Sequence, residues 1–587
     1  MVVRMAVDGI SVYLGSIRRG NKRRHPVHGS TFGPGMGEAM DRRISATLIR
    51  LWWTRSREID AIHGRVEIIK GEDPVKATFI DRMRAKIRSH EDNIDRIIMA
   101  AIPALNPLKI RTTTNGEAIE GFKKGDDDHD EQPLSPMSRL FHEPGSNVYI
   151  VGIMGLKTKI QPHIFKRNLV HTFLNNHRFS SLQVKDKETG SMKWIPTQVN
   201  IDDHVIVEKL DPNMESSDKF VEDFISNLSR SPIESTKPLW DLHILDIRTS
   251  EAEGTCVFRF HHSLGDGVSL MNLLLACSCK TSDPEALPTL PGNIKKSGAT
   301  NSSLWASLGV LWNSFVALVM FVLTALFLED TKTPIKGSKG VEHRPRRFVT
   351  KSVSLDDIKL VKNAMKVTVN DVVLGVTQAG FYLYLHRRYC ERDIGYNNFP
   401  DNIRLRATLF FNLRATTKIQ DVTGRSRHGT WGNKIGYALH PFKIGPKKDP
   451  LDYVRDAKAV MDRRKASFEP LFTSFFANTV LKLFGVKVAG KLNHKIFSNT
   501  TLWFSNVPGP QEEISFCGHE VAYIAPSCYG QPNALMINIV SYKDKVTFVL
   551  SADEETIPNP HELCDDLEES LRLIKASICS SHTMSNL

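Results

Sequence analysis

The chain has 587 residues, of which 41% are hydrophobic, and a formal net charge of +12. This length and composition predict a globular protein of about two to four domains with a sizeable core. The positive charge favours an anionic partner, but the sequence has none of the zinc-finger, basic-zipper or RNP-type patterns typical of nucleic-acid binding, so we expect no nucleic-acid partner. The eight cysteines form no disulfide framework and no paired CxxC motif, which indicates a reducing compartment.

Residues 1–131 differ in composition from the rest of the chain. They contain a cluster of arginines and lysines at 18–24, apolar residues at helical spacing over 77–102, and an acidic run that begins at 125. The spacing predicts a helix over 77–102. No chemistry is assigned to this N-terminal extension, whose role the sequence leaves unknown.

From residue 132 onward, β-rich segments alternate with helical ones, which predicts an α/β chain of two comparable halves. In the first half, 132–295, strands are expected at 147–156, 238–247 and 255–262, and helices at 163–177 and 267–278. In the second half, 346–578, helices are expected at 355–365 and 368–389, and strands at 347–355, 406–414, 501–509, 521–526 and 535–552. A short tail, 579–587, follows.

The linker between the halves, 296–345, contains the most apolar segment of the protein, 304–328. This segment lies in a window without charged side chains, 297–328. About 20 apolar residues can cross a hydrocarbon core, so a span is physically feasible. Basic residues flank both ends and therefore favour neither orientation. A buried core helix is the alternative, but the length of the window favours membrane association.

Two adjacent histidines end the expected strand at 255–262 and precede the sequence SLGDG. Neighbouring residues of a strand point to opposite faces, so His261 and His262 cannot easily share an ion, and we predict no metal site. Gly265 and Gly267 flank Asp266 and predict a turn with backbone angles that favour glycine. An imidazole in such a turn can act as a general base near neutral pH, a role that we assign to His262. Asp266 either orients the imidazole or braces the turn through a distant arginine, and the spacing favours the brace.

No serine or cysteine lies in a recognisable nucleophile motif such as GxSxG. The simplest chemistry is therefore direct acyl transfer, in which the base activates an acceptor that attacks a bound thioester. This reaction also needs a hydrogen-bond donor for the oxyanion. Asn370 and Asn506 are the candidates.

The phrase HHSLGDG matches the HHxxxDG signature of a superfamily that includes chloramphenicol acetyltransferases and peptide-synthetase condensation domains. Further phrases narrow the resemblance: PLSPMSRLF, PLWDLHIL, TVNDVVLG, FFNLR, WGNKIGY and FSNVPGP. With these phrases, residues 132–578 resemble the plant form of the wax ester synthase/diacylglycerol acyltransferase family.

The resemblance implies a two-domain, chloramphenicol-acetyltransferase-like fold. It also implies a fatty acyl-CoA co-substrate, no cofactor, and a long-chain alcohol or diacylglycerol as acceptor. By the family pattern His262 is the base, supported by His261 and Asp266. The remaining residues that it implies serve the acyl pocket or the integrity of the fold: Pro238, Leu239, Trp240, Asn370 and Asp371. As a hypothesis of our own, Arg414 is the brace for Asp266.

A single crossing by 304–328 would place the two halves on opposite sides of a membrane and divide their shared site. We therefore expect this segment to re-enter the membrane or to lie at its interface, so that membrane lipid is a further partner. The endoplasmic reticulum with a cytosolic active site is the expected location, and the plasma membrane is the alternative. Two other functions stay open: a catalytically silent lipid-binding scaffold, and a condensation-type acyltransferase.

Overall fold

The structure is a computed structural model that describes residues 132–188, 190–210, 214, 216–290, 304–392, 399–400, 402–414 and 431–585. These residues belong to one compact unit of the chain. The N-terminal extension, including the helix expected at 77–102, lies outside the described residues.

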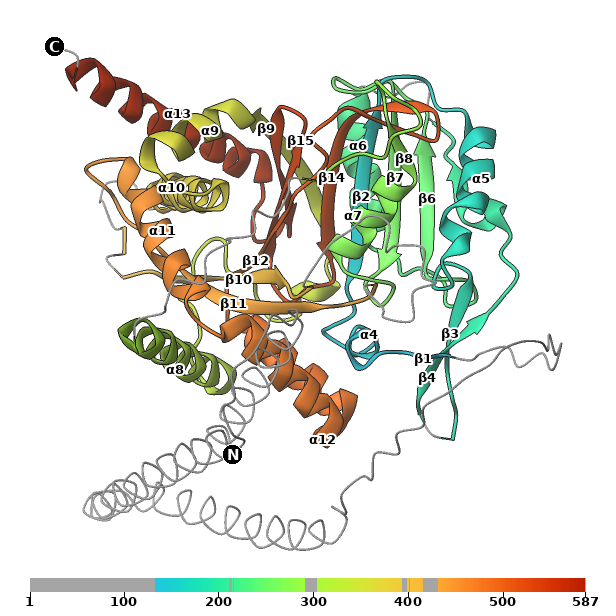
Figure 1. Cartoon of the computed structure of the whole chain (residues 1–587), viewed down its shortest axis with the longest axis horizontal. Helices are drawn as coiled ribbons and strands as arrows, with labels where there is room; N and C mark the ends of the chain where they lie inside the picture. Colours follow the sequence, from blue (N-terminus) through green and yellow to red (C-terminus); the bar gives the residue numbers. More distant parts are fainter. Residues whose placement is uncertain are drawn as a thin grey trace, which may run out of the picture. The chain divides into compact units, whose positions relative to one another are not determined.

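Two large sheets form the body of this unit (Figure 1). The first sheet has seven strands, in the spatial order β5 (Val205–Val207), β6 (Trp240–Leu245), β7 (Gly254–His261), β2 (Tyr149–Leu156), β14 (His519–Tyr529), β13 (Ile514–Phe516) and β8 (Ser278–Lys280). The second has six, in the order β11 (Ile435–Lys443), β10 (Arg404–Asn412), β12 (Leu502–Val507), β15 (Leu535–Tyr542), β16 (Lys545–Ala552) and β9 (Arg347–Ser354). A small sheet joins β1 (Gln132–Pro133), β4 (Met192–Pro196) and β3 (Ser181–Lys185).

Helices cover both sheets. In the first half these are α4 (Pro136–Leu140), α5 (Pro162–His171), α6 (Ser217–Leu228) and α7 (Gly267–Ala276). The second half contains α9 (Leu355–Met365), α10 (Val369–Arg392), α11 (Leu451–Lys465), α12 (Glu469–Ser498) and α13 (Pro560–Ser585). Buried apolar side chains of α9, α10, α11 and α13 pack with those of the six-stranded sheet in one core (Figure 1).

The expected strands and helices of both halves are confirmed, although their ends differ: the helix expected at 163–177 ends at His171. The central strands β2, β6 and β7 are buried along almost their whole length, as their apolar sequences require. The halves are nevertheless interlocked. Strand β14 follows β12 in the chain, but it pairs antiparallel with β2 in the sheet of the first half. Helix α13 also continues to Ser585, past the expected start of the tail at 579.

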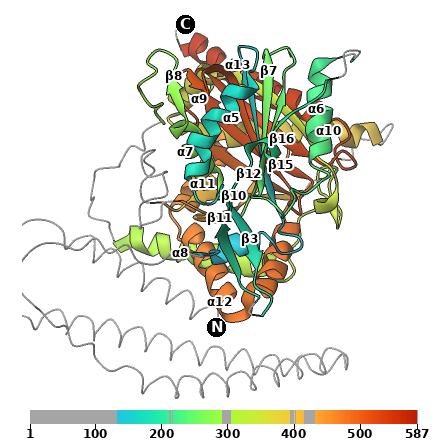
Figure 2. The same ribbon diagram turned by 90° about the vertical axis from the view of Figure 1, so that its right-hand side faces the viewer.

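The apolar segment of the linker forms helix α8 (Leu304–Leu326). This helix and α12 lie at the same end of the body in both views (Figures 1 and 2). Phe321 of α8 is buried against the rings of Phe472 and Phe476 of α12. Both helices are long and apolar enough to cross a membrane, and only 17% of the most apolar window of each is buried within the protein. The apolar character of α12 is absent from the sequence prediction, which named 304–328 alone.

Candidate active site

The two histidines lie where β7 leads into α7. His261 is the last residue of the strand, and Asp266 is the N-cap of the helix, accepting a 3.0 Å hydrogen bond from the backbone N–H of Ser269. The prediction that the turn needs glycine for its backbone angles is wrong, because neither Gly265 nor Gly267 has a positive φ. At Gly265 there is little room for a side chain, because an added Cβ would lie only 3.2 Å from Cβ of Ser269. At Gly267 an added Cβ would make only an ordinary contact, 3.6 Å from Val507.

Asp266 joins the first half of the site to the second. One oxygen of its carboxylate lies 2.9 Å from Nη1 of Arg414 and accepts a 2.9 Å hydrogen bond from the backbone N–H of Lys434. Both side chains of the ion pair are at most 4% exposed. Arg414 also donates to the backbone oxygen of Gly432 and to Oγ of Ser269. The predicted arginine therefore lies in contact with Asp266, and the pair spans the two halves of the chain.

His262 is held by residues of both halves. Its backbone N–H donates to the oxygen of Val148, 2.9 Å away, and its ring stacks on Phe141 with centroids 4.1 Å apart. Nδ1 lies 3.1 Å from Oδ1 of Asn433, whose amide nitrogen donates to the backbone oxygen of His262. That second bond orients the amide, so its oxygen faces the ring and Nδ1 carries the proton. Nε2 is then the basic nitrogen.

Burial lowers the pKa of His262 below its ordinary value of 6.5. The nearby negative charge of Asp266 and the hydrogen bond to Asn433 raise the pKa and oppose this effect only in part. Near neutral pH the imidazole is therefore neutral, which is the form that can accept a proton.

His261 faces the opposite direction and is fully surrounded by protein. Its Nε2 lies 2.9 Å from Oδ1 of Asn147, and its Nδ1 lies 2.6 Å from Oγ of Ser263. Burial lowers the pKa of His261 well below 6.5. Both ring nitrogens are thus used within the fold, so that His261 can support the turn but has no free nitrogen for a substrate.

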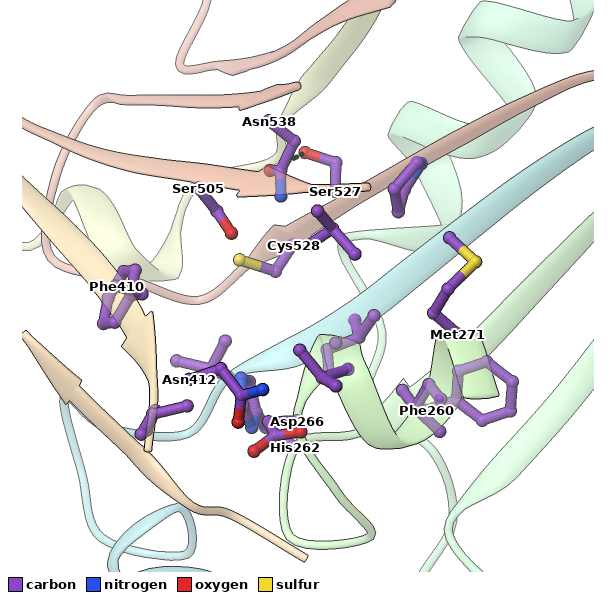
Figure 3. A pocket seen from close by; sticks show the side chains of 18 of the residues that line it. Phe260, His262, Asp266, Met271, Phe410, Asn412, Ser505, Ser527, Cys528 and Asn538 are labelled. Carbon is purple, nitrogen blue, oxygen red and sulfur yellow. Dashed lines mark hydrogen bonds between the residues drawn. The ribbon is translucent and has the colours of Figure 1, made fainter. Parts of the chain in front are cut away.

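A cavity of about 450 Å3 lies between the two sheets and is lined by His262. Its walls are mostly apolar, with Phe258, Phe260 and Met271 on one side and Phe410 and Trp503 on the other. Figure 3 shows His262 and Asp266 together at one part of this wall, with Ser505, Ser527 and Asn538 at another. An apolar cavity with few polar groups suits a ligand with a long hydrocarbon chain.

Three residues expected to shape an acyl pocket lie in the core behind the cavity. Trp240 is fully buried and donates through Nε1 to the backbone oxygen of Phe179, 2.9 Å away. It packs against Phe173, which does line the cavity. Pro238, Leu239 and Trp240 are not among the described residues that line it. Their position fits the integrity of the fold rather than contact with a ligand.

Asn370 and Asp371, at the start of α10, have different roles. Asp371 accepts a hydrogen bond from the backbone N–H of Thr368, whose hydroxyl accepts one from the N–H of Asp371, so this pair caps the helix. Asn370 accepts a 3.3 Å hydrogen bond from Nδ2 of Asn506, and Asn506 lines the cavity. Of the two predicted oxyanion donors, only Asn506 therefore faces the site directly.

Several residues that hold the site are absent from the prediction. Asn433 and Phe141 position the ring of His262, and Trp431 donates to the backbone oxygen of Leu264 across 2.7 Å. Asn433 lies in the phrase WGNKIGY, beside Gly432, whose φ is +111. The glycine of this phrase is the sequence signal for a turn with backbone angles that favour glycine. No group of three or more metal-ligating side chains occurs among the described residues.

Comparisons with known protein families identify the family of this chain. Residues 165–373 match the model of the wax ester synthase/diacylglycerol acyltransferase catalytic domain, and residues 431–575 match that of the WS/DGAT C-terminal domain. Together the two matched ranges cover most of the chain. The chain belongs to this family.

Curated relatives agree with this assignment. Wax ester synthase/diacylglycerol acyltransferases 4 and 11 of Arabidopsis thaliana are 44% and 45% identical to the chain. These alignments cover 78% and 76% of the chain and 93% and 96% of the relatives. The protein is therefore an acyltransferase of plant type.

A solved structure supports the predicted fold. The wax ester synthase/diacylglycerol acyltransferase from Marinobacter aquaeolei VT8 superposes with a TM-score of 0.52 at 18% identity. The match covers 76% of this chain and 99% of that one. The acyltransferase fold expected from the HHxxxDG signature is thus confirmed.

Proposed function

We propose that the protein transfers a fatty acyl group from acyl-CoA to a long-chain alcohol, a diacylglycerol or both. One observation carries this proposal: His262, whose Nδ1 is held by Asn433, lines a mostly apolar cavity between the two halves of the fold. Family membership supports the same substrates, because the curated relatives are named as wax ester synthases and diacylglycerol acyltransferases.

In this mechanism Nε2 of His262 accepts the proton of the acceptor hydroxyl as its oxygen attacks the thioester carbonyl. The tetrahedral intermediate collapses, the C–S bond breaks, and the CoA sulfur leaves with the proton from the imidazolium. Asn506 is the proposed donor for the oxyanion, since its side chain lines the cavity. No covalent acyl-enzyme is formed. Cys528 also lines the cavity, but burial raises the pKa of its thiol so far that it is not a thiolate nucleophile.

The same proposal places the enzyme at a membrane surface, with α8 in its interface. Exposed apolar side chains of α8 recur at helical spacing along one face: Leu308, Leu311, Trp312, Phe315, Val316 and Val319. Leu483, Phe484 and Val488 of α12 are exposed as well, and exposed Lys482, Lys487 and Lys491 on the same helix supply charge for anionic lipid.

The other face of α8 is bound to the catalytic body, which favours an interfacial helix over a span. Asn313 donates to the backbone oxygen of Ala466, and Thr324 accepts from Arg406. Just beyond the helix, Asp330 pairs with Arg406, and both side chains are at most 4% exposed. With these contacts intact both halves stay on one side of the membrane, and we propose the cytosolic side of the endoplasmic reticulum.

The test supplies microsomes containing the protein with labelled palmitoyl-CoA and equal amounts of hexadecanol and dioleoylglycerol. A His262→Ala variant gives the background. Wax ester or triacylglycerol above that background supports the proposal and identifies the preferred acceptor. If neither product exceeds the background, the protein is a lipid-binding scaffold or an acyltransferase with another acceptor.

A further inference from the structure

Three polar side chains lie together on an otherwise apolar part of the cavity wall. Ser505 of β12, Asn538 of β15 and Ser527 of β14 all line the cavity (Figure 3). Ser505 and Asn538 are direct neighbours in the register of β12 and β15. Asn538 and Ser527 are only 7% and 2% exposed. Polar groups so deep in an apolar wall are costly unless each of them finds a hydrogen-bond partner.

The hydrogen bond between Ser527 and Asn538 fixes the direction of the amide. The hydroxyl of Ser527 donates to Oδ1 of Asn538 over 3.3 Å. The amide oxygen is therefore used within the protein, while Nδ2 keeps its two N–H groups. Figure 3 shows this nitrogen on the same side as Ser505 and Cys528. Nδ2 donates to no residue in the described part of the chain, so it offers a hydrogen-bond donor to the cavity.

A buried donor without a protein partner points to a ligand that brings an oxygen. Buried polar groups almost always have hydrogen-bond partners, and each exception needs a physical reason. The buried amide of Asn533, a few residues earlier in the chain, follows this rule, because it donates to the backbone oxygens of Phe497 and Thr500. Asn538 lacks such partners but lines a cavity, as the few polar groups that orient a ligand in an apolar pocket commonly do.

Among the proposed substrates, diacylglycerol best supplies this oxygen. The acceptor hydroxyl and the thioester carbonyl react at His262, and beyond them a long-chain alcohol and a fatty acyl chain are hydrocarbon. Diacylglycerol has two ester carbonyls beside its free hydroxyl, and each can accept a hydrogen bond. The pantetheine arm of CoA also has carbonyls, but it leads to a diphosphate that must stay in water. The wall beside Asn538 instead continues with Met536 and Cys528, which contact each other.

We propose that Asn538 is a specificity-determining residue, whose Nδ2 donates a hydrogen bond to an ester carbonyl of diacylglycerol. Ser527 positions the amide through Oδ1. The free hydroxyl of the glycerol meets His262, which lies on another part of the same cavity wall (Figure 3). A long-chain alcohol has no ester and gains nothing from this subsite. The inference rests on the proposed function.

The first experiment varies the acceptor and leaves the protein unchanged. The full-length wild type in detergent receives palmitoyl-CoA with either dioleoylglycerol or its diether analogue, in which methylene groups replace the ester carbonyls. One hydrogen bond to a buried donor is worth up to about tenfold, and the diether leaves that donor unpaired. The value of kcat/KM should therefore be about tenfold higher for the diester than for the diether.

The second experiment removes the donor. Asn538→Leu keeps a similar volume and should lower kcat/KM for dioleoylglycerol about tenfold, while the values for the diether and for hexadecanol change less than about twofold. Ser527→Ala should act in the same direction with a smaller effect, because the amide is then free to turn. Thr547→Val is the matched control. It removes a buried hydroxyl on β16, outside the residues that line the cavity, and should leave the ratios of the three values unchanged.

Equal kcat/KM values for the diester and the diether in the wild type would overturn the inference, whether or not the variants fold. An equal loss with dioleoylglycerol and hexadecanol in Asn538→Leu would overturn it too, since it would indicate a role common to both reactions, such as oxyanion binding. Wax ester without triacylglycerol would contradict the inference and leave the proposed function intact. If neither ester forms, the proposed function fails, and the relative binding of diester and diether, followed by tryptophan fluorescence, still tests Asn538.

Discussion

Removal of the Asp266 carboxylate tests whether the two halves are braced through Arg414. Asp266→Ala leaves the buried guanidinium of Arg414 and the backbone N–H of Lys434 without this acceptor and removes the cap of α7. Breaking a buried ion pair typically costs 3–5 kcal/mol, and these neighbouring losses overlap, so we expect about 3–5 kcal/mol in total. Asp266→Asn keeps the cap and loses the charge, so we expect about 2–3 kcal/mol.

Urea unfolding in detergent, followed by tryptophan fluorescence, measures these losses. Ser354→Ala is the matched control, because Ser354 caps α9 through two backbone N–H groups. It should cost only about 1 kcal/mol. If Asp266→Ala costs no more than Ser354→Ala, the ion pair does not brace the turn and the reasoning is refuted.

Three further predictions concern the base and the membrane surface. Asn433→Ala should lower kcat about tenfold with little change in KM, because the ring of His262 loses a hydrogen bond worth about 1 kcal/mol and its fixed tautomer. Since burial lowers the pKa of His262, the pH profile of kcat/KM should be flat above 6.5 and fall only in more acidic buffer. A profile that falls already between pH 8 and 7 would contradict that direction. Replacing Leu311 and Phe315 by serine should release the enzyme from vesicles but preserve turnover in detergent, whereas equal losses would argue against an interfacial α8.

Local patterns were sufficient to predict the elements that carry the site. Short runs of β-forming residues predicted β2 and β7, which are buried along almost their whole length, and longer helical runs predicted α7 and α10. The turn between β7 and α7 was also predicted, although Gly265 is needed for lack of space rather than for its backbone angles, and neither reason applies to Gly267.

Contacts between distant segments could not be predicted from such patterns. Asn433 lies 171 residues after His262, and β14, late in the second half, pairs with β2, early in the first half. Pairing of this kind depends on the assembled fold and leaves no local period. The sequence analysis did not predict α12, because lysines and Gly485 interrupt its apolar sequence. Gly485 lies at a kink of this helix, with φ +78.

The measurement that tests the central claim most directly is the single-turnover rate of ester formation by purified His262→Ala. Palmitoyl-CoA is the donor and hexadecanol or dioleoylglycerol is the acceptor. If His262 is the general base, the rate should fall by about 10² to 10⁴, while melting temperature and acyl-CoA affinity stay close to those of the wild type. A variant that folds, binds acyl-CoA and forms ester within a few fold of the wild-type rate would contradict the account.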